Sequence, residues 1–145
     1  MPHSRPQEDE NRTTVLCYII TGSDGSIDPE YAGAPPTFSE LVEMTKRFFV
    51  RATLNRHLNA LIAEGLITKD YDPKSKRLGY VIANEKQSLL AMLNYFIERE
   101  KAAMKNTVEL ERAVGSLKIA LKPFGKLPKD IQKAMRELEK EGWNV

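Results

Sequence analysis

The chain has 145 residues, of which 41% are hydrophobic and 29% are charged, and its formal net charge is +2. This length and composition are typical of a soluble globular protein with an ordinary core. They exclude a membrane-spanning helix, because no apolar run approaches the roughly 20 residues that a span needs.

The N-terminus, MPHSRPQEDENR, is polar and carries charges of both signs. It lacks the apolar segment of a signal peptide, so we expect a cytoplasmic protein. We predict a disordered tail over residues 1–11, a DNA-binding domain over 12–83 and a helical dimerisation region over 84–145. The single cysteine, Cys17, lies in an apolar run and is expected to be a buried thiol.

Residues 13–21, TTVLCYIIT, are apolar and β-branched, a pattern that fits either a strand or a buried helix. We favour a buried helix, because a helix–turn–helix needs a third helix packed behind it. Residues 22–36 are rich in Gly, Pro and Asp and predict a loop that is long for a connection between helices. We interpret this loop as an ordinary surface insertion.

Two amphipathic helices are predicted next. Thr37 and Glu40 have the spacing of a capping box, which places the start of the first helix at Thr37. After the link KRFFV, a second helix has apolar residues at i, i+4, i+8, i+11 and i+12, and Gly65 stands where helices commonly end. The apolar residues of this second helix are Val50, Leu54, Leu58, Leu61 and Ile62.

A β-hairpin is predicted after the second helix. Leu66 and Ile67 begin one strand, the segment 72–75 (DPKS) is a turn signal, and residues 78–82 form the returning strand. The predicted fold class is therefore mostly α with a small β-wing, in which a winged helix–turn–helix is followed by long C-terminal helices.

Positive charge is concentrated in this region. Residues 46–77 contain eight basic and three acidic residues, a local net charge of +5, so the rest of the chain carries −3. A local positive field on a nearly neutral protein points to a polyanion at one face. The alternative is an ordinary solvated surface.

The outer face of the second helix has side chains that suit the major groove of DNA. Arginine can bind guanine through O6 and N7, and asparagine can bind adenine through N6 and N7. The basic tip of the hairpin suits the phosphate backbone. The alternative for both is a soluble polar surface, and His57, which adjoins the apolar face, is expected to be a packing residue. The predicted DNA-binding residues are Arg47, Arg51, Ala52, Asn55, Arg56, Asn59, Lys74, Lys76 and Arg77.

Residues 37–82 resemble the winged helix–turn–helix of MarR- and ArsR-type transcription regulators. The resemblance is densest over VRATLNRHLNALIAEGLITK, where the family commonly has Arg-small-Thr-apolar-polar-Arg-His-Leu followed by an acidic-Gly-Leu-Ile exit. It implies a DNA-binding helix, a basic wing and a homodimer on a palindromic site. The chain departs from the family at Val50, where a capping Ser or Thr is usual.

The C-terminal third is predicted to be helical. A 4-3 spacing of apolar residues begins at Leu89 and continues over four heptads, Pro123 ends this helix, and a last helix begins near Pro128. We predict that the seam pairs with a second subunit, and the alternative is packing against Ile131, Met135, Leu138 and Trp143 of the same chain. The predicted dimerisation residues are Leu89, Leu93, Phe96, Leu110, Val114, Leu117 and Leu121.

Nothing in the sequence indicates an enzyme, a metal site or a cofactor. His3 and His57 are far apart, and one cysteine cannot supply a zinc-ligand set. The sequence therefore predicts a dimeric transcription regulator that binds double-stranded DNA. The alternative is a winged-helix module that binds protein within a replication, segregation or transcription assembly.

Overall fold

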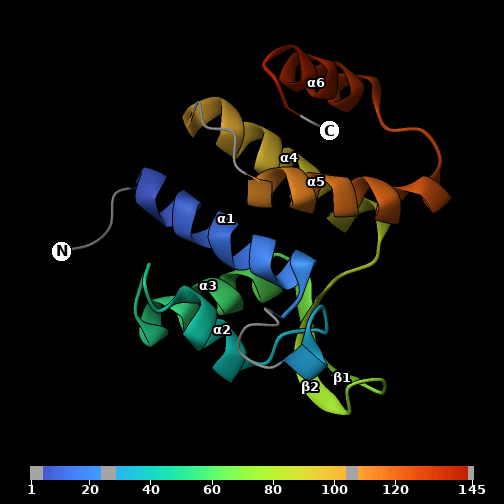
Figure 1. Ribbon diagram of the computed structural model, residues 1–145. Helices are drawn as coiled ribbons and strands as arrows, with labels where there is room; N and C mark the ends of the chain where they lie inside the picture. The colour runs from blue at the N-terminus through green and yellow to red at the C-terminus, as the bar shows by residue number, and fades with distance from the viewer. Residues whose placement is uncertain (1–4, 24–28, 104–107, 144–145) are drawn as a thin grey trace. The chain divides into compact units, whose positions relative to one another are not determined.

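The computed structural model describes residues 5–23, 29–103 and 108–143, and in these residues the chain forms six α-helices and one two-stranded sheet (Figure 1). The chain divides into two units, residues 1–83 and 84–145. The first unit contains α1 (Arg5–Thr21), η1 (Pro29–Tyr31), α2 (Phe38–Thr45), α3 (Arg51–Ala63), β1 (Ile67–Asp72) and β2 (Arg77–Ile82). The second contains α4 (Lys86–Ala103), α5 (Val108–Leu121), η2 (Lys122–Phe124) and α6 (Lys129–Lys140).

Helix α1 packs on α2, α3 and β2 (Figure 1), so the helix expected over residues 13–21 is confirmed. The helix starts earlier than the sequence predicted, because residues 5–11, assigned to a disordered tail, are helical. That segment is polar and offers no apolar periodicity, yet it is rich in Glu, Gln and Arg, which are good helix formers. In the C-terminal half of α1, the side chains of Val15, Leu16 and Ile19 are buried in the core.

Helices α2 and α3 supply the centre of the first core. The capping box is present, with the Thr37 hydroxyl accepting from the Glu40 amide and the Glu40 carboxylate accepting from the Thr37 amide. On α3, Leu54, Leu58 and Leu61 are at most 1% exposed, and each such burial contributes about 1.5–3 kcal/mol to folding.

Two residues that the sequence placed on the apolar face of α3 do not belong to it. Val50 is 69% exposed and Ile62 is 41% exposed. Val50 precedes the helix in an extended conformation, and His57 takes the remaining place in the buried stripe. Gly65, with φ +76°, follows the end of the helix as predicted.

Strands β1 and β2 form an antiparallel hairpin in which Ile67 is opposite Ile82 and Asp72 is opposite Arg77. The outer edge of β2 is covered by the end of the long loop, since the Tyr80 amide donates to the Pro36 carbonyl at 2.9 Å. Gly79 permits this approach, because a Cβ atom there would lie 2.6 Å from the Pro35 carbonyl oxygen.

The long loop is closed where it begins and ends. The Ser23 amide donates to the Ala34 carbonyl at 2.8 Å, and the Gly33 amide donates to the Ser23 carbonyl at 3.0 Å. These two bonds form a neck, which we define as residues 22, 23, 33 and 34. Gly22 has φ +90°, and a Cβ atom on it would lie 2.5 Å from the Gly33 oxygen.

In the second unit α4 packs beside α5, and α6 packs on α4. The single long heptad helix expected from the sequence is instead two helices, because the apolar spacing weakens around residues 100–107. The side chains predicted for a subunit interface are at most 7% exposed within the single chain, so they pack inside this unit, as in the intramolecular alternative. They are Leu89, Leu93 and Phe96 on α4 and Leu110, Val114, Leu117 and Leu121 on α5.

The last helix lies where the sequence predicted it. Pro128 precedes α6, and Ile131, Met135 and Leu138 form its buried stripe. Trp143 is 4% exposed just beyond the end of the helix. The intramolecular alternative for the C-terminal seam therefore agrees with the burial of this unit.

Candidate nucleic-acid interface

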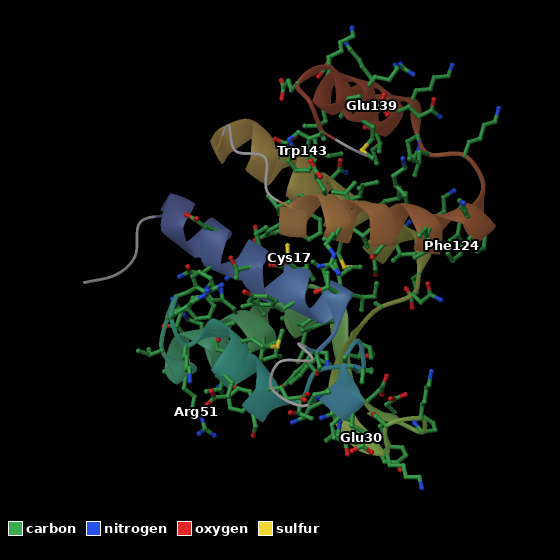
Figure 2. The ribbon with its side chains drawn as sticks, in the orientation of Figure 1. Cys17, Glu30, Arg51, Phe124, Glu139 and Trp143 are labelled. Atoms are coloured by element: carbon green, nitrogen blue, oxygen red, sulfur yellow. The ribbon has the colours of Figure 1, made fainter. Side chains whose placement is uncertain are left out.

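Helix α3 presents a continuous polar face to the solvent. Since Leu54, Leu58 and Leu61 point into the core, the residues on the opposite side of the helix remain outside. Figure 2 shows Arg51 projecting from the surface of the first unit. All five predicted DNA-binding residues of this helix are exposed, namely Arg51, Ala52, Asn55, Arg56 and Asn59.

The link before α3 contains two aromatic side chains, one exposed and one buried. The amides of Phe48 and Phe49 both donate to the Thr45 carbonyl, which turns the chain back on itself. Phe49 is buried with its ring 6.0 Å from that of His57, whereas Phe48 is 49% exposed. The guanidinium of Arg47 lies 4.7 Å from the centre of the Phe48 ring, so Arg47 is also held at the surface.

His57 is fully buried and joins α3 to α1. Arg12 Nε donates to His57 Nδ1 at 3.3 Å, and Arg12 Nη1 lies 3.3 Å from Glu64 Oε1. This agrees with the expectation that His57 is a packing residue. The contacts fix α3 against α1 at both the middle and the end of the helix, so its outer face has a defined orientation in the unit.

A shallow depression lies at the start of the polar face. It has a volume of about 530 Å³ and is lined by Phe38 of α2 and by Arg51, Ala52 and Asn55 of α3. The Arg51 guanidinium lies 5.0 Å from the centre of the Phe38 ring. Phe38 was not among the predicted site residues, although its position directly after the capping residue of α2 places it beside the start of α3.

The tip of the hairpin is ordered by Asp72. Its Oδ2 atom accepts from the Ser75 hydroxyl at 2.6 Å and from the Ser75 amide at 3.0 Å, and these hydrogen bonds lower the pKa of the Asp72 carboxyl. The Lys76 amide donates to the Asp72 carbonyl at 2.7 Å while Lys76 takes φ +59°. Lys74 and Lys76 are exposed on this turn, as predicted for phosphate-contacting residues.

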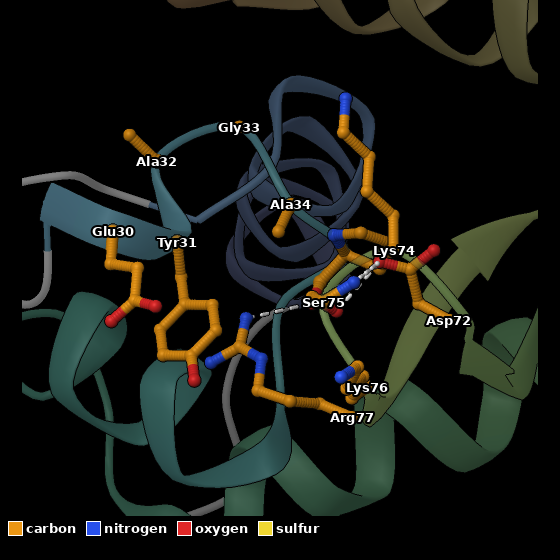
Figure 3. A pocket seen from close by; sticks show the side chains of 11 residues that line it. Glu30, Tyr31, Ala32, Gly33, Ala34, Asp72, Lys74, Ser75, Lys76 and Arg77 are labelled. Atoms are coloured by element: carbon orange, nitrogen blue, oxygen red, sulfur yellow. Dashed lines mark hydrogen bonds between the residues drawn. The ribbon is translucent and has the colours of Figure 1, made fainter.

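Arg77 does not behave as predicted. Its Nη1 atom lies 2.9 Å from Glu40 Oε2, its Nη2 atom donates to the Pro35 carbonyl at 3.3 Å, and its guanidinium stacks 3.8 Å from the centre of the Tyr31 ring (Figure 3). The side chain is only 17% exposed. Arg77 thus joins β2 to α2 and to the loop, and its guanidinium is held by Glu40, Pro35 and Tyr31 rather than presented freely at the tip of the hairpin.

Glu40 is the acceptor at the centre of this arrangement. It accepts from Arg77, from the Ser23 hydroxyl at 2.7 Å and from the Thr37 amide at 3.0 Å. Burial by itself would raise the pKa of the Glu40 carboxyl, but these hydrogen bonds and the charge of Arg77 outweigh it and lower that pKa. Glu40 therefore stays ionised and compensates the buried guanidinium.

A second hollow lies between the long loop and the tip of the hairpin (Figure 3). Its volume is about 700 Å³, and its walls are the backbone of residues 32–35, the Tyr31–Arg77 stack and the side chains of Lys74 and Lys76. Glu30 and Asp72 also line it, so cations and anions are mixed around it. The hollow therefore has no dominant charge that would select a ligand.

Lys69 adds one more cation to the hairpin. Its Nζ atom lies 5.5 Å from the centre of the Tyr80 ring, and the side chain is exposed. On the same face of the hairpin Tyr71 and Leu78 are paired across the strands and are 60% and 51% exposed. The hairpin therefore combines exposed lysines with an exposed apolar pair, which the charge pattern did not reveal.

Two further searches cover only the described part of the chain. Residues 5–23, 29–103 and 108–143 contain no group of three His, Cys, Asp or Glu residues placed to hold a metal ion. They also contain no helix with the length and apolar character needed to cross a membrane. Cys17 is buried and forms no disulfide, as expected.

Comparisons of the chain with protein-family models, with curated proteins and with solved structures find no match. Any functional conclusion must therefore come from the residues of the α3 face and the hairpin and from their chemistry.

Proposed function

We propose that this chain is a sequence-specific double-stranded DNA-binding protein that acts as a transcription regulator through a winged helix–turn–helix. In this proposal α3 enters the major groove and the β1–β2 hairpin is the wing that contacts the neighbouring backbone. The observation that carries the proposal is the outer face of α3, where guanidinium, amide and methyl side chains are exposed together on one side of the helix.

The distribution of exposed cations supports the same function. Removing Arg77 from the set leaves exposed basic side chains on both elements that would approach DNA. Phosphate contacts of this kind supply affinity and position the helix, while the α3 face supplies sequence information. The exposed basic residues are Lys46, Arg47, Arg51 and Arg56 near or on α3 and Lys69, Lys74 and Lys76 on the hairpin.

A protein partner is the second candidate, and a specific observation favours it. Phe48 and Val50 are 49% and 69% exposed directly before α3, and Tyr71 and Leu78 are exposed on the hairpin. Exposed apolar side chains of this size often mark protein-binding surfaces. A protein partner of that surface would not require the polar face of α3, which is why we place DNA first.

The homodimer is a weaker part of the proposal, because the seven side chains expected at its interface are already buried in the chain. A dimer would have to form through another surface. Sedimentation velocity at tens of micromolar decides this, and a monomer would remove the expectation of a palindromic site.

The function is tested by selection of duplexes from a random pool, followed by salt titration on the selected and on an unrelated sequence. We expect enrichment of a defined site and a steep loss of affinity with salt. Asn55→Ala should reduce the preference for the selected site, since one good base contact discriminates by about 1–3 kcal/mol. Arg136→Ala, an exposed change on α6, is the matched control. If no sequence is enriched and binding does not depend on salt, the protein candidate takes precedence.

A further inference from the structure

We propose that the depression beside Arg51 is a thymine-methyl subsite, so that α3 recognises a site containing a thymine at this position. The occupant is the 5-methyl group of one thymine in the major groove. This inference rests on the proposed function, because it assigns the base that one part of the α3 face would recognise.

The walls of the depression have the required chemistry. Phe38 supplies an aromatic ring and Ala52 supplies a methyl group, while Arg51 and Asn55 complete the lining. Alanine and phenylalanine are among the side chains that make apolar contact with the thymine methyl. Thymine is the only one of the four DNA bases that carries this group in the major groove. A cytosine in the same place would present no methyl group to this surface.

The position of the Phe38 ring is set by the first turn of α2 and by its contact with Arg51. Phe38 is the first residue of α2, and the capping box between Thr37 and Glu40 fixes the backbone of that first turn. The side chain of Phe38 is only partly exposed, and the Arg51 guanidinium lies 5.0 Å from the centre of its ring. This cation–π contact orients Arg51 at the edge of the depression before any ligand arrives.

The spacing on α3 adds a second base contact next to the methyl subsite. Asn55 follows Ala52 by three residues and Arg51 by four, so all three lie on one side of the helix. An asparagine amide matches N6 and N7 of adenine, and an arginine matches O6 and N7 of guanine. The three residues together favour a short site in which a thymine neighbours an adenine or a guanine.

The surrounding charge is the reason for placing DNA rather than an apolar peptide in the depression. Arg51 forms part of its wall, and the exposed Arg47 and Arg56 belong to the same region of α2–α3. An aliphatic side chain from a peptide would also fill the apolar wall, but it would not compensate these cations, whereas a duplex brings the methyl group together with phosphates.

The experiment uses the duplex selected with the full chain. Each thymine of that duplex is replaced in turn by deoxyuridine, which removes only the 5-methyl group. We expect one replacement to weaken binding about fourfold, the effect of losing one buried methyl group, and the other replacements to have little effect. Phosphate contacts are the same in all these duplexes, so the comparison isolates the methyl group.

Protein variants connect that thymine to the depression. Ala52→Gly should lower the thymine-to-uracil ratio at the sensitive position, because one of the two apolar walls is removed. Ala63→Gly, an exposed change on the last turn of α3, has the same type of backbone cost and should keep the ratio. Phe38→Leu, checked for folding by thermal melting, should reduce the ratio without abolishing binding.

Two failures can be distinguished. If no duplex is enriched and salt has no effect on binding, the proposed function itself fails. If a defined duplex is bound but no thymine shows the methyl effect, or if Ala52→Gly leaves the effect unchanged, DNA binding stands and the thymine-methyl subsite is wrong.

Discussion

Arg77 Nη1 lies 2.9 Å from Glu40 Oε2 and joins the first residue of β2 to the first turn of α2. The same guanidinium stacks on Tyr31 and donates to the Pro35 carbonyl, so one side chain contacts the loop, α2 and the sheet. The pair therefore sets the position of the hairpin relative to α2, which precedes the proposed recognition helix.

Arg77→Ala is expected to destabilise the first unit by about 3 kcal/mol, because it leaves the carboxylate of Glu40 buried without its charged partner. Arg77→Lys should restore only part of this loss, since an ammonium lacks the planar face with which the guanidinium stacks on Tyr31 while donating to its two other partners. Thermal and urea unfolding of both variants measures the effect. If Arg77→Ala leaves stability unchanged but lowers DNA affinity, Arg77 is a phosphate contact after all.

The contribution of the Arg77–Glu40 pair to the free energy of unfolding should decrease as the pH falls. The pKa of Glu40 is lowered in the folded protein, so its contribution is complete above the unfolded pKa of about 4.3 and is lost as the pH falls through the folded pKa. The difference in unfolding free energy between wild type and Glu40→Gln should be largest above about pH 5 and shrink towards pH 3. Glu43→Gln, in an exposed pair with Lys46, is the control and should change stability little. A constant difference over this range would contradict the assignment.

Replacing Lys74 and Lys76 together by Ala should flatten the salt dependence of DNA binding. Two lost phosphate contacts would reduce the log–log slope by about 1.8, and affinity should fall equally for selected and unrelated sequences. The control is Lys129→Ala with Lys133→Ala, which removes two exposed lysines from α6. An unchanged slope in the hairpin variant, or an equal change in the control, would exclude the hairpin as a phosphate contact.

Leu117→Glu should unfold the second unit rather than dissociate a dimer. Leu117 is 0% exposed, so the substitution buries an unpaired charge, which costs several kcal/mol. Ile119→Glu is the matched control two residues along the same helix, where the native side chain is 67% exposed. Circular dichroism should show loss of helix only for Leu117→Glu. A folded Leu117→Glu variant with a smaller sedimentation coefficient than wild type would restore the interface that the sequence predicted.

Val50→Ser should stabilise α3. Val50 has the extended conformation of a capping residue, φ −80° and ψ 164°, but its side chain accepts no hydrogen bond. A serine hydroxyl in this place can accept from an amide of the first turn and should contribute about 1 kcal/mol relative to Val50→Ala. Chemical denaturation of the two variants measures this. Val50→Ser and Val50→Ala also separate the candidate functions. Both variants lose an apolar side chain that a protein partner would bury, so both should lower the affinity for such a partner equally.

Local signals explain the parts of the fold that the sequence predicted. The capping box of Thr37 and Glu40, the leucines of α3 and the turn at Asp72 each depend on residues within a few positions of one another. Their patterns are complete in the sequence, so these elements and the exposed lysines of the hairpin could be placed in advance.

The errors come from interactions between distant residues. Arg77 and Glu40 are 37 positions apart, and nothing near Arg77 in the sequence separates it from the lysines of the same turn. The burial of Leu93 and Leu117 within the single chain could not be predicted for a different reason. Two helices that bury their apolar stripes within one chain have the same spacing as one long helix that pairs with a partner, so periodicity alone cannot distinguish them.

The neck of the long loop has a consequence for the length that the loop can take. Because Ser23 and Ala34 are hydrogen-bonded to each other and Gly22 contacts Gly33, the chain that leaves α1 returns to the place from which it departed. The chain between the two sides of the neck can therefore gain or lose residues at a small entropic cost without displacing α2 or the hairpin. This makes it a natural position for an inserted peptide or a fluorescent tag.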